Sequence, residues 1–197
     1  MSTVLATTHA SWYASRAAGT AALALASASV GYGLLTAGRM LPRKLGGRRI
    51  VHEALSLATL VAIAVHGLVL LGDTYMNPSL ADVLIPFASS YQRWWTSLGI
   101  VAGWTLVVLG LSYYVRARIG VARWRVMHRF TLLAWLAGIA HSLGEGTDAG
   151  KAWFVAMLAI AIAPALAMAV LRLAGRAPRG PGATPAPPAA PRRRVAA

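Results

Sequence analysis

The stretch from Arg48 to Gly72 reads RRIVHEALSLATLVAIAVHGLVLLG and carries no charged residue after Glu53. A helix needs about 20 mostly apolar residues to cross the roughly 30 Å of hydrocarbon in a bilayer. Only helices and closed barrels satisfy their backbone hydrogen bonds inside lipid, and the ten-residue alternating segments typical of barrels do not occur in this sequence. The stretch therefore predicts a transmembrane helix.

The rest of the sequence continues this pattern. It is 57% hydrophobic and 12% charged, whereas ordinary soluble domains carry about 25% charged residues. We predict an all-α integral membrane helical bundle of about five transmembrane helices, at residues 17–38, 50–72, 94–115, 126–143 and 152–173. These helices form one membrane domain (15–174), between an outer N-terminal tail (1–14) and a basic cytoplasmic tail (175–197) whose Pro, Ala, Gly and Arg content predicts disorder.

Charge indicates the direction of the helices. The 19 Lys and Arg against 5 Asp and Glu give a net charge of +14, and the basic residues gather in segments 39–49 and 116–125 and in the tail. The positive-inside rule assigns these segments to the cytoplasm, which puts the N-terminus outside and the C-terminus inside. We therefore expect a multi-pass protein of the cell (inner or plasma) membrane, surrounded by lipid and without a nucleic-acid partner.

A cleaved signal peptide over the first apolar block is the less favoured alternative. Signal peptides have a positive region before the apolar run. Here only Arg16 precedes the block and a dense basic segment follows it. This charge bias favours a retained first helix.

The absence of cysteine limits the cofactors. With no Cys in the sequence, disulfides, iron–sulfur clusters, c-type haem attachment and thiolate metal sites are excluded. Any metal must therefore bind histidine or carboxylate. No glycine-rich nucleotide fingerprint is present either, so we expect flavin to act only through a partner.

Four of the five histidines fall in predicted membrane helices. His52 and His66 lie fourteen residues apart in the second helix, and His128 and His141 lie thirteen apart in the fourth. At 1.5 Å per residue these separations are about 21 and 20 Å. Both helices start at the cytoplasmic face, so the four rings are expected to form two pairs at matched depths. His9, in the outer tail, is taken as incidental.

Two imidazoles that face each other across a helix bundle suit the two axial positions of a haem iron. Zinc requires three or four ligands at one depth. A proton relay requires carboxylates within the membrane, where only Glu53 qualifies, at the inner edge. We therefore predict two b-type haems, with the inner iron on His52 and His128 and the outer iron on His66 and His141. At any one position, the alternative to a haem ligand is a histidine that only makes an interhelical hydrogen bond.

The thirteen-residue spacing is imperfect. At about 100° per residue, fourteen residues return within about 40° of the starting face, whereas thirteen miss it by about 140°. A π-bulge, a helix tilt or an off-centre haem are the alternatives that would absorb the difference.

Haem propionates need cationic partners. Arg129, directly after His128, and Arg49 are the preferred candidates at the inner pair. The further candidates are Arg48 and Arg125 at the inner pair, and Arg93, Gln92 and Lys151 at the outer pair. A topological or lipid-facing charge is the alternative reading of each arginine.

At these residues the chain resembles the ferric-reductase-like transmembrane domain family, which includes the membrane domains of NADPH oxidases and ferric reductases. The resembling features are RRIVH (48–52) with His66, and WRVMHR (124–129) with His141. The fourteen-then-thirteen spacing is similar to the oxidase and ferric-reductase branch. The Trp-x-x-x-His-Arg element looks like the haem subunit of the periplasmic methionine sulfoxide reductase system. The resemblance covers about residues 39–173.

The resemblance implies an oxidoreductase subunit that passes electrons from a cytoplasmic donor, through the inner and then the outer haem, to an acceptor outside. Two departures qualify it: no flavin and nicotinamide domain follows the helices, and five membrane helices are predicted where six are common. A separate flavin reductase or a quinol must then supply electrons. Ferric iron, oxygen and a partner oxidoreductase all stay open as acceptors.

Two other functions remain as alternatives. A cytochrome b561-like quinol-linked oxidoreductase also uses four histidines, but usually on four successive helices rather than two. A haem-free membrane scaffold or transporter would use the histidines only for packing, and haem content separates it from the other two.

Overall fold

The computed structural model describes residues 2–38, 40–41 and 47–175, and in this part of the chain the structure is helical and contains no strand. The elements in order are α1 (Ser2–Ala37), α2 (Arg48–Leu70), α3 (Leu80–Leu84), α4 (Arg93–Leu111), the 3-10 helix η1 (Ser112–Val115), α5 (Arg116–Ile119), α6 (Val121–His128), α7 (Thr131–Glu145) and α8 (Ala152–Leu173). The predicted tail at 176–197 and most of the basic segment 39–49 lie outside the described residues.

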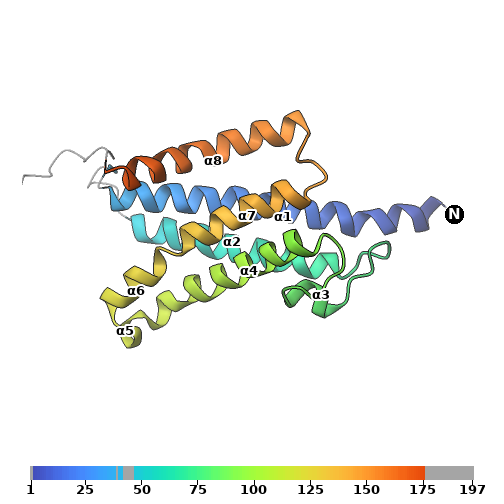
Figure 1. Cartoon of the computed structure of the whole chain (residues 1–197), viewed down its shortest axis with the longest axis horizontal. Helices are drawn as coiled ribbons and strands as arrows, with labels where there is room; N and C mark the ends of the chain where they lie inside the picture. Colours follow the sequence, from blue (N-terminus) through green and yellow to red (C-terminus); the bar gives the residue numbers. More distant parts are fainter. Residues whose placement is uncertain (1, 39, 42–46, 176–197) are drawn as a thin grey trace, which may run out of the picture.

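The long helices run side by side along one axis (Figure 1). α1 extends through the middle of the bundle, where it packs most extensively against α2 and also contacts α7 and α8. α4 packs mainly against α7. α3 lies at one end of the bundle together with the α7–α8 connection, and α5 and α6 lie at the other end (Figure 1).

Small residues on α1 allow the close approach of α8. Ala22 and Ala26 of α1 and Ala165 of α8 are buried, and Ala165 is only 1% exposed. Phe154, Leu158, Ile162 and Ala165 follow each other on α8 at intervals of four, four and three residues, which places them on one face of that helix. This face packs with α1 and with Trp135 of α7 to form the hydrophobic core.

Four helical segments are long and apolar enough to cross a membrane: Ala10–Ala37, Arg48–Leu70, Arg93–Ile119 and Ala152–Leu173. Their outward faces carry large apolar side chains such as Leu68 (66% exposed) and Ile160 (78% exposed). Exposed apolar surface on this scale is unusual for a soluble monomer and suits contact with lipid. By length and composition, the four segments fit a multi-pass membrane protein.

The predicted fourth membrane helix, 126–143, is not a single helix. α6 ends at His128, and α7 begins at Thr131 and has 15 residues, fewer than the about 20 that a membrane crossing requires. Between them the backbone is tightened: Arg129 N donates to Val126 O, and Phe130 N donates to Met127 O, at 3.2 and 3.0 Å. These bonds to the third preceding residue are typical of a 3-10 turn rather than of an α-helix.

Charged residues divide between the two ends of the bundle. Asp73 and Asp82 belong to the α2–α4 connection, and Glu145 and Asp148 lie where α7 ends and the α7–α8 connection begins, all toward the α3 end (Figure 1). The opposite end holds the start of α2 and the basic α5 and α6. Ser79 and Asp82 form a capping box at α3, and the hydrogen bonds from Ser79 lower the pKa of the Asp82 carboxyl.

We predict that Ser27→Ala destabilises the fold. Trp135 Nε1 donates to Ser27 Oγ at 3.0 Å inside the core, and the alanine would leave this buried N–H without its acceptor, at a cost of about 1–3 kcal/mol. Reversible unfolding in mixed micelles, followed by circular dichroism, measures the loss. Thr105→Ala is the matched control, because the Thr105 hydroxyl bonds only the Val101 carbonyl of its own helix. Equal losses in both variants would contradict the prediction.

Candidate functional site

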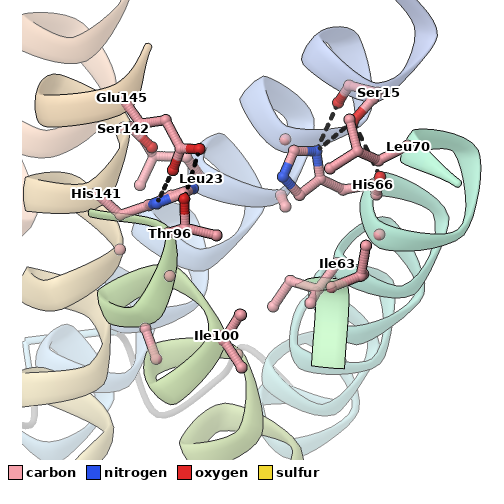
Figure 2. A pocket seen from close by; sticks show the side chains of 18 of the residues that line it. Ser15, Leu23, Ile63, His66, Leu70, Thr96, Ile100, His141, Ser142 and Glu145 are labelled. Atoms are coloured by element: carbon pink, nitrogen blue, oxygen red, sulfur yellow. Dashed lines mark hydrogen bonds and ion pairs between the residues drawn. The ribbon is translucent and has the colours of Figure 1, made fainter. Parts of the chain in front are cut away.

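A cavity of about 550 Å³ lies within the bundle at the level of His66 and His141. α1, α2, α4 and α7 all contribute to its walls, which are mostly apolar. Figure 2 shows His66 and His141 on opposite sides of this cavity. Cavities of about 300–1,000 Å³ with apolar walls and a few placed polar groups are typical of sites for cofactors and other small ligands.

His66 is held by α1. Its Nδ1 lies 2.7 Å from the Ser15 carbonyl oxygen and 3.0 Å from Ser15 Oγ, and the Ser15 hydroxyl also donates to the His66 carbonyl at 3.0 Å. A protonated Nδ1 that donates to a backbone carbonyl leaves Nε2 as the nitrogen with a free lone pair. The same arrangement orients many metal-binding histidines in proteins.

His141 is held in the same way by α4. Its Nδ1 lies 2.9 Å from the Trp95 carbonyl oxygen and 3.1 Å from Glu145 Oε2. Glu145 is fixed in turn by Thr96, whose hydroxyl donates to Glu145 Oε1 at 2.9 Å. His141 therefore also keeps Nε2 available for a ligand.

Glycines bring neighbouring helices close to both rings. A Cβ atom added at Gly19 of α1 would lie 3.0 Å from His66 Nδ1, and one added at Gly99 of α4 would lie 2.6 Å from His141 Nδ1. The rings therefore occupy the space that a side chain at either glycine would need. These two glycines were not among the residues predicted for the site.

His52 and His128 meet directly. Their ring centroids are 6.2 Å apart and their planes are nearly perpendicular, at 87°. This separation leaves room for one metal ion at about 2 Å from a nitrogen of each ring. His52 Nδ1 bonds Ser29 Oγ at 3.3 Å, and Trp124 stacks on His128 with centroids 4.8 Å apart.

His128 Nδ1 is buried and finds no hydrogen-bond partner among the described residues. A buried polar atom without a partner is costly and calls for an explanation, such as a bound ion or ligand. A ligand bond to Nδ1 itself would supply one.

The structure thus places the four predicted histidines in two groups, with His52 beside His128 and with His66 and His141 around one cavity. Within the part of the chain that the structure describes, no three His, Asp or Glu side chains gather in a group that could hold a metal ion. Each group therefore offers two histidine ligands, which is the number that a haem iron takes from a protein when both axial positions are filled.

The turn after His128 offsets part of the rotational mismatch of the thirteen-residue spacing. Leu132 N donates to Arg129 O at 3.2 Å, which continues the tightened bonding of Arg129 and Phe130. In 3-10 geometry each residue advances about 120° instead of about 100°, so a few such residues rotate His141 back toward the face of His128. A π-bulge would rotate it the other way, and the structure has the tightened turn in its place.

The predicted propionate partners lie at the surface. Arg129 and Arg49 are exposed, and the Arg49 guanidinium lies 5.0 Å from the centroid of the Tyr113 ring. Neither Arg93 nor Lys151 lines the cavity at the outer pair.

Arg16 is the arginine that lines this cavity. It forms an ion pair with Asp148 of the α7–α8 connection, and its guanidinium lies 4.2 Å from the centroid of the Trp12 ring. Arg16 was not among the residues predicted for the site. The sequence signal that could have found Arg16 is its position on the first helix. It lies three residues before Gly19, one helical turn further toward the α3 end.

Comparisons with protein-family models, with curated proteins and with solved structures each found no match to this chain. The arrangement of the histidines is therefore the main evidence for the function of this chain.

We predict that Gly99→Ala destabilises the protein by about 1–3 kcal/mol, the usual cost of forcing extra volume into a packed site. The added Cβ would lie 2.6 Å from the His141 ring, which the Trp95 carbonyl holds in place. Gly103→Ala, one turn away on the same helix, is the control, because its Cβ would meet Ile63 at an ordinary 3.5 Å. Unfolding midpoints in detergent test the difference, and a control as unstable as Gly99→Ala would contradict the prediction.

Proposed function

We propose that this protein is a haem-bearing membrane subunit that transfers electrons between the two faces of the bilayer. The observation that carries the proposal is the occurrence of two histidine pairs, one at each level of the bundle, with His66 and His141 on opposite sides of a cavity of about 550 Å³. Along α2 the two levels are about 21 Å apart, from fourteen residues at 1.5 Å each. One b-type haem is assigned to each pair.

The residues around each pair suit this assignment. Ser15, Trp95 and Ser29 engage Nδ1 of three of the four rings, which leaves Nε2 of these rings free to bind iron. A haem iron with two histidine ligands takes up and releases one electron at a time. The protein orients the rings and lines the cavity at the outer pair mostly with apolar side chains.

The proposal includes five membrane crossings, with α6 and α7 together as the fourth. Residues 121–145 are helical apart from the tightened turn at Arg129 and Phe130, so the combined segment has the length of a crossing. Under the positive-inside rule the basic α5–α6 end faces the cytoplasm and the α3 end faces outward. The N-terminus is then outside and the C-terminus inside, in the cell (inner or plasma) membrane.

The electron donor and acceptor follow from this orientation. His52 and His128 serve as the inner site, which receives electrons from a cytoplasmic flavin reductase or a quinol. His66 and His141 serve as the outer site, which passes them to ferric iron, oxygen or a partner oxidoreductase. We assign the chain on the same grounds to the ferric-reductase-like group of transmembrane domains, by the spacing of its four histidines.

The purified protein is expected to contain two b-type haems per chain, and His66→Ala is expected to contain one, because only the outer iron loses a ligand. Haem content by the pyridine haemochrome assay and a dithionite-reduced minus oxidised spectrum measure both. His9→Ala is the control, since His9 belongs to neither pair, and it should keep two haems.

Two results would count against this assignment. A His66→Ala variant with two haems and an unchanged spectrum would show that His66 is not a ligand. A wild-type chain without haem, expressed with ample haem supply, would leave a haem-free scaffold or transporter as the function.

The orientation is testable by cysteine labelling, because the natural chain has no cysteine. Ser90→Cys, in the α2–α4 connection, is expected to react with a membrane-impermeant maleimide added to intact cells. Ala122→Cys, in α6, should react only after the cells are permeabilised. Both positions are exposed, so access depends on the side of the membrane. The reverse labelling pattern would invert the topology.

A further inference from the structure

α1 carries a Ser-x-x-x-Gly pattern three times, at Ser15/Gly19, Ser27/Gly31 and Ser29/Gly33. The middle pair faces the core, where Ser27 accepts from Trp135 and Gly31 lies beside Ala165. The other two pairs contact α2, and they are fourteen residues apart, which is also the separation of His52 and His66. We call each of these two pairs a histidine seat, because each contacts one histidine of α2.

The outer seat, Ser15 with Gly19, contacts His66 from two sides. Ser15 binds His66 Nδ1 through its carbonyl and its hydroxyl, and Gly19 leaves room for the ring, since a Cβ there would lie 3.0 Å from Nδ1. The serine thus fixes the rotation of the ring, and the glycine allows α1 to approach it.

The inner seat, Ser29 with Gly33, contacts His52 in the same way. A Cβ at Gly33 would lie 3.2 Å from His52 Cε1, and Ser29 Oγ lies 3.3 Å from His52 Nδ1. Ser29 Oγ also lies 2.9 Å from Ser56 Oγ, and the Ser56 hydroxyl donates to the His52 carbonyl at 2.8 Å. When Nδ1–H donates to Ser29 and Ser29 donates to Ser56, every donor in this small ring of bonds has one acceptor.

The equal spacing has a geometric cause. α1 and α2 run antiparallel, and on each helix fourteen residues return to nearly the same face after about 21 Å. One face of α1 therefore meets one face of α2 at two depths. A serine and a glycine four residues apart lie on the same face, so both reach the same ring.

We propose that Ser15 and Ser29 are positioning residues for the two haem-ligand histidines of α2, and that α1 thereby sets the electronic properties of both sites. This inference rests on the proposed function. A hydrogen bond from Nδ1–H raises the basicity of a metal-binding imidazole, which favours ferric over ferrous iron.

The two seats differ in their distances. At His66 the Ser15 carbonyl and hydroxyl lie 2.7 and 3.0 Å from Nδ1. At His52 the Ser29 hydroxyl lies 3.3 Å from Nδ1, and the Ser29 backbone also interacts with the ring. Alanine at either serine removes the hydroxyl and keeps the backbone carbonyl.

The experiment is a reductive titration of the purified full-length protein, with haem content and two midpoint potentials measured for each variant. Ser29→Ala is expected to raise the midpoint potential of the inner haem, to leave that of the outer haem unchanged, and to weaken haem retention at the inner site by about tenfold. Ser29→Thr, which keeps the hydroxyl, should restore the wild-type potential. Ser29→Cys, of similar size but with a weaker acceptor, keeps the test available if alanine impairs folding, and it should shift the potential in the same direction by less.

The glycines provide an independent test on the same helix. Gly33→Ala should perturb the inner haem and Gly19→Ala the outer haem, each seen as loss of that haem or as a shift of its potential. Gly31→Ala is the matched control between them, because its Cβ would meet Ala165 at an ordinary 3.5 Å. This control should keep both haems with unchanged potentials.

The outcomes separate this inference from the proposed function. If the wild-type chain contains two haems, and Ser29→Ala and Ser29→Cys leave their potentials unchanged, the positioning role of the histidine seats is contradicted. The proposed function is then unaffected. Equal shifts of both haems in Ser29→Ala also overturn the seats, since a general loss of packing explains them. A wild-type chain without haem overturns both proposals.

Discussion

The structure depends on how buried imidazoles satisfy their ring nitrogens inside an apolar bundle. An unpaired polar group away from water costs several kcal/mol, and the bundle supplies a partner to Nδ1 of three of the four rings. His66 finds the Ser15 carbonyl, His141 the Trp95 carbonyl and His52 the Ser29 hydroxyl. These bonds pin one nitrogen of each ring and leave the other for a ligand. They also fix how α1 meets α2 and how α4 meets α7, the pairs of helices with the closest packing.

The distribution of small residues allows the helices to pack closely and still leaves space for a large ligand. Gly19 and Gly99 let α1 and α4 approach the histidines of their partner helices. The space between α2 and α4, which contact each other less, remains open as part of the cavity at His66 and His141. The core of Trp135 and the α8 face packs on α1 and also forms part of the cavity wall, through Trp135 and Phe154. A mostly apolar cavity with a packed wall is typical of a site for a cofactor or other small ligand.

The tightened turn at Arg129 and Phe130 links the helix count to the site. It shortens α7 to 15 residues, so α7 alone is too short to span a bilayer. The same turn rotates His141 part of the way back toward the face of His128, because each 3-10 residue advances about 120° instead of about 100°. One local departure from α-helical geometry thus explains the division of the predicted helix and reduces the mismatch of the thirteen-residue spacing. A 3-10 stretch within a helical segment often marks a functional hinge or a sequence under strain.

The sequence by itself determined the apolar helices, the separation of charge between the two ends of the bundle, and the four histidines at two levels, because composition and spacing along a helix depend only on local order. Five apolar helices were predicted, and four are long enough to cross a membrane among the described residues. The fourth predicted helix is divided at Arg129, where hydropathy does not register the change of backbone hydrogen bonding. Only the tertiary structure decided which groups hold the rings. Ser15, Ser29 and the Trp95 carbonyl lie on other helices, at separations of 51, 23 and 46 residues from their histidines. Backbone carbonyls carry no sequence signal, and a Ser-x-x-x-Gly pattern acquires meaning only when an antiparallel neighbour places a histidine against it. The position of Arg16 at the cavity is likewise a tertiary effect, because it depends on the path of α1 and on the ion pair with the α7–α8 connection.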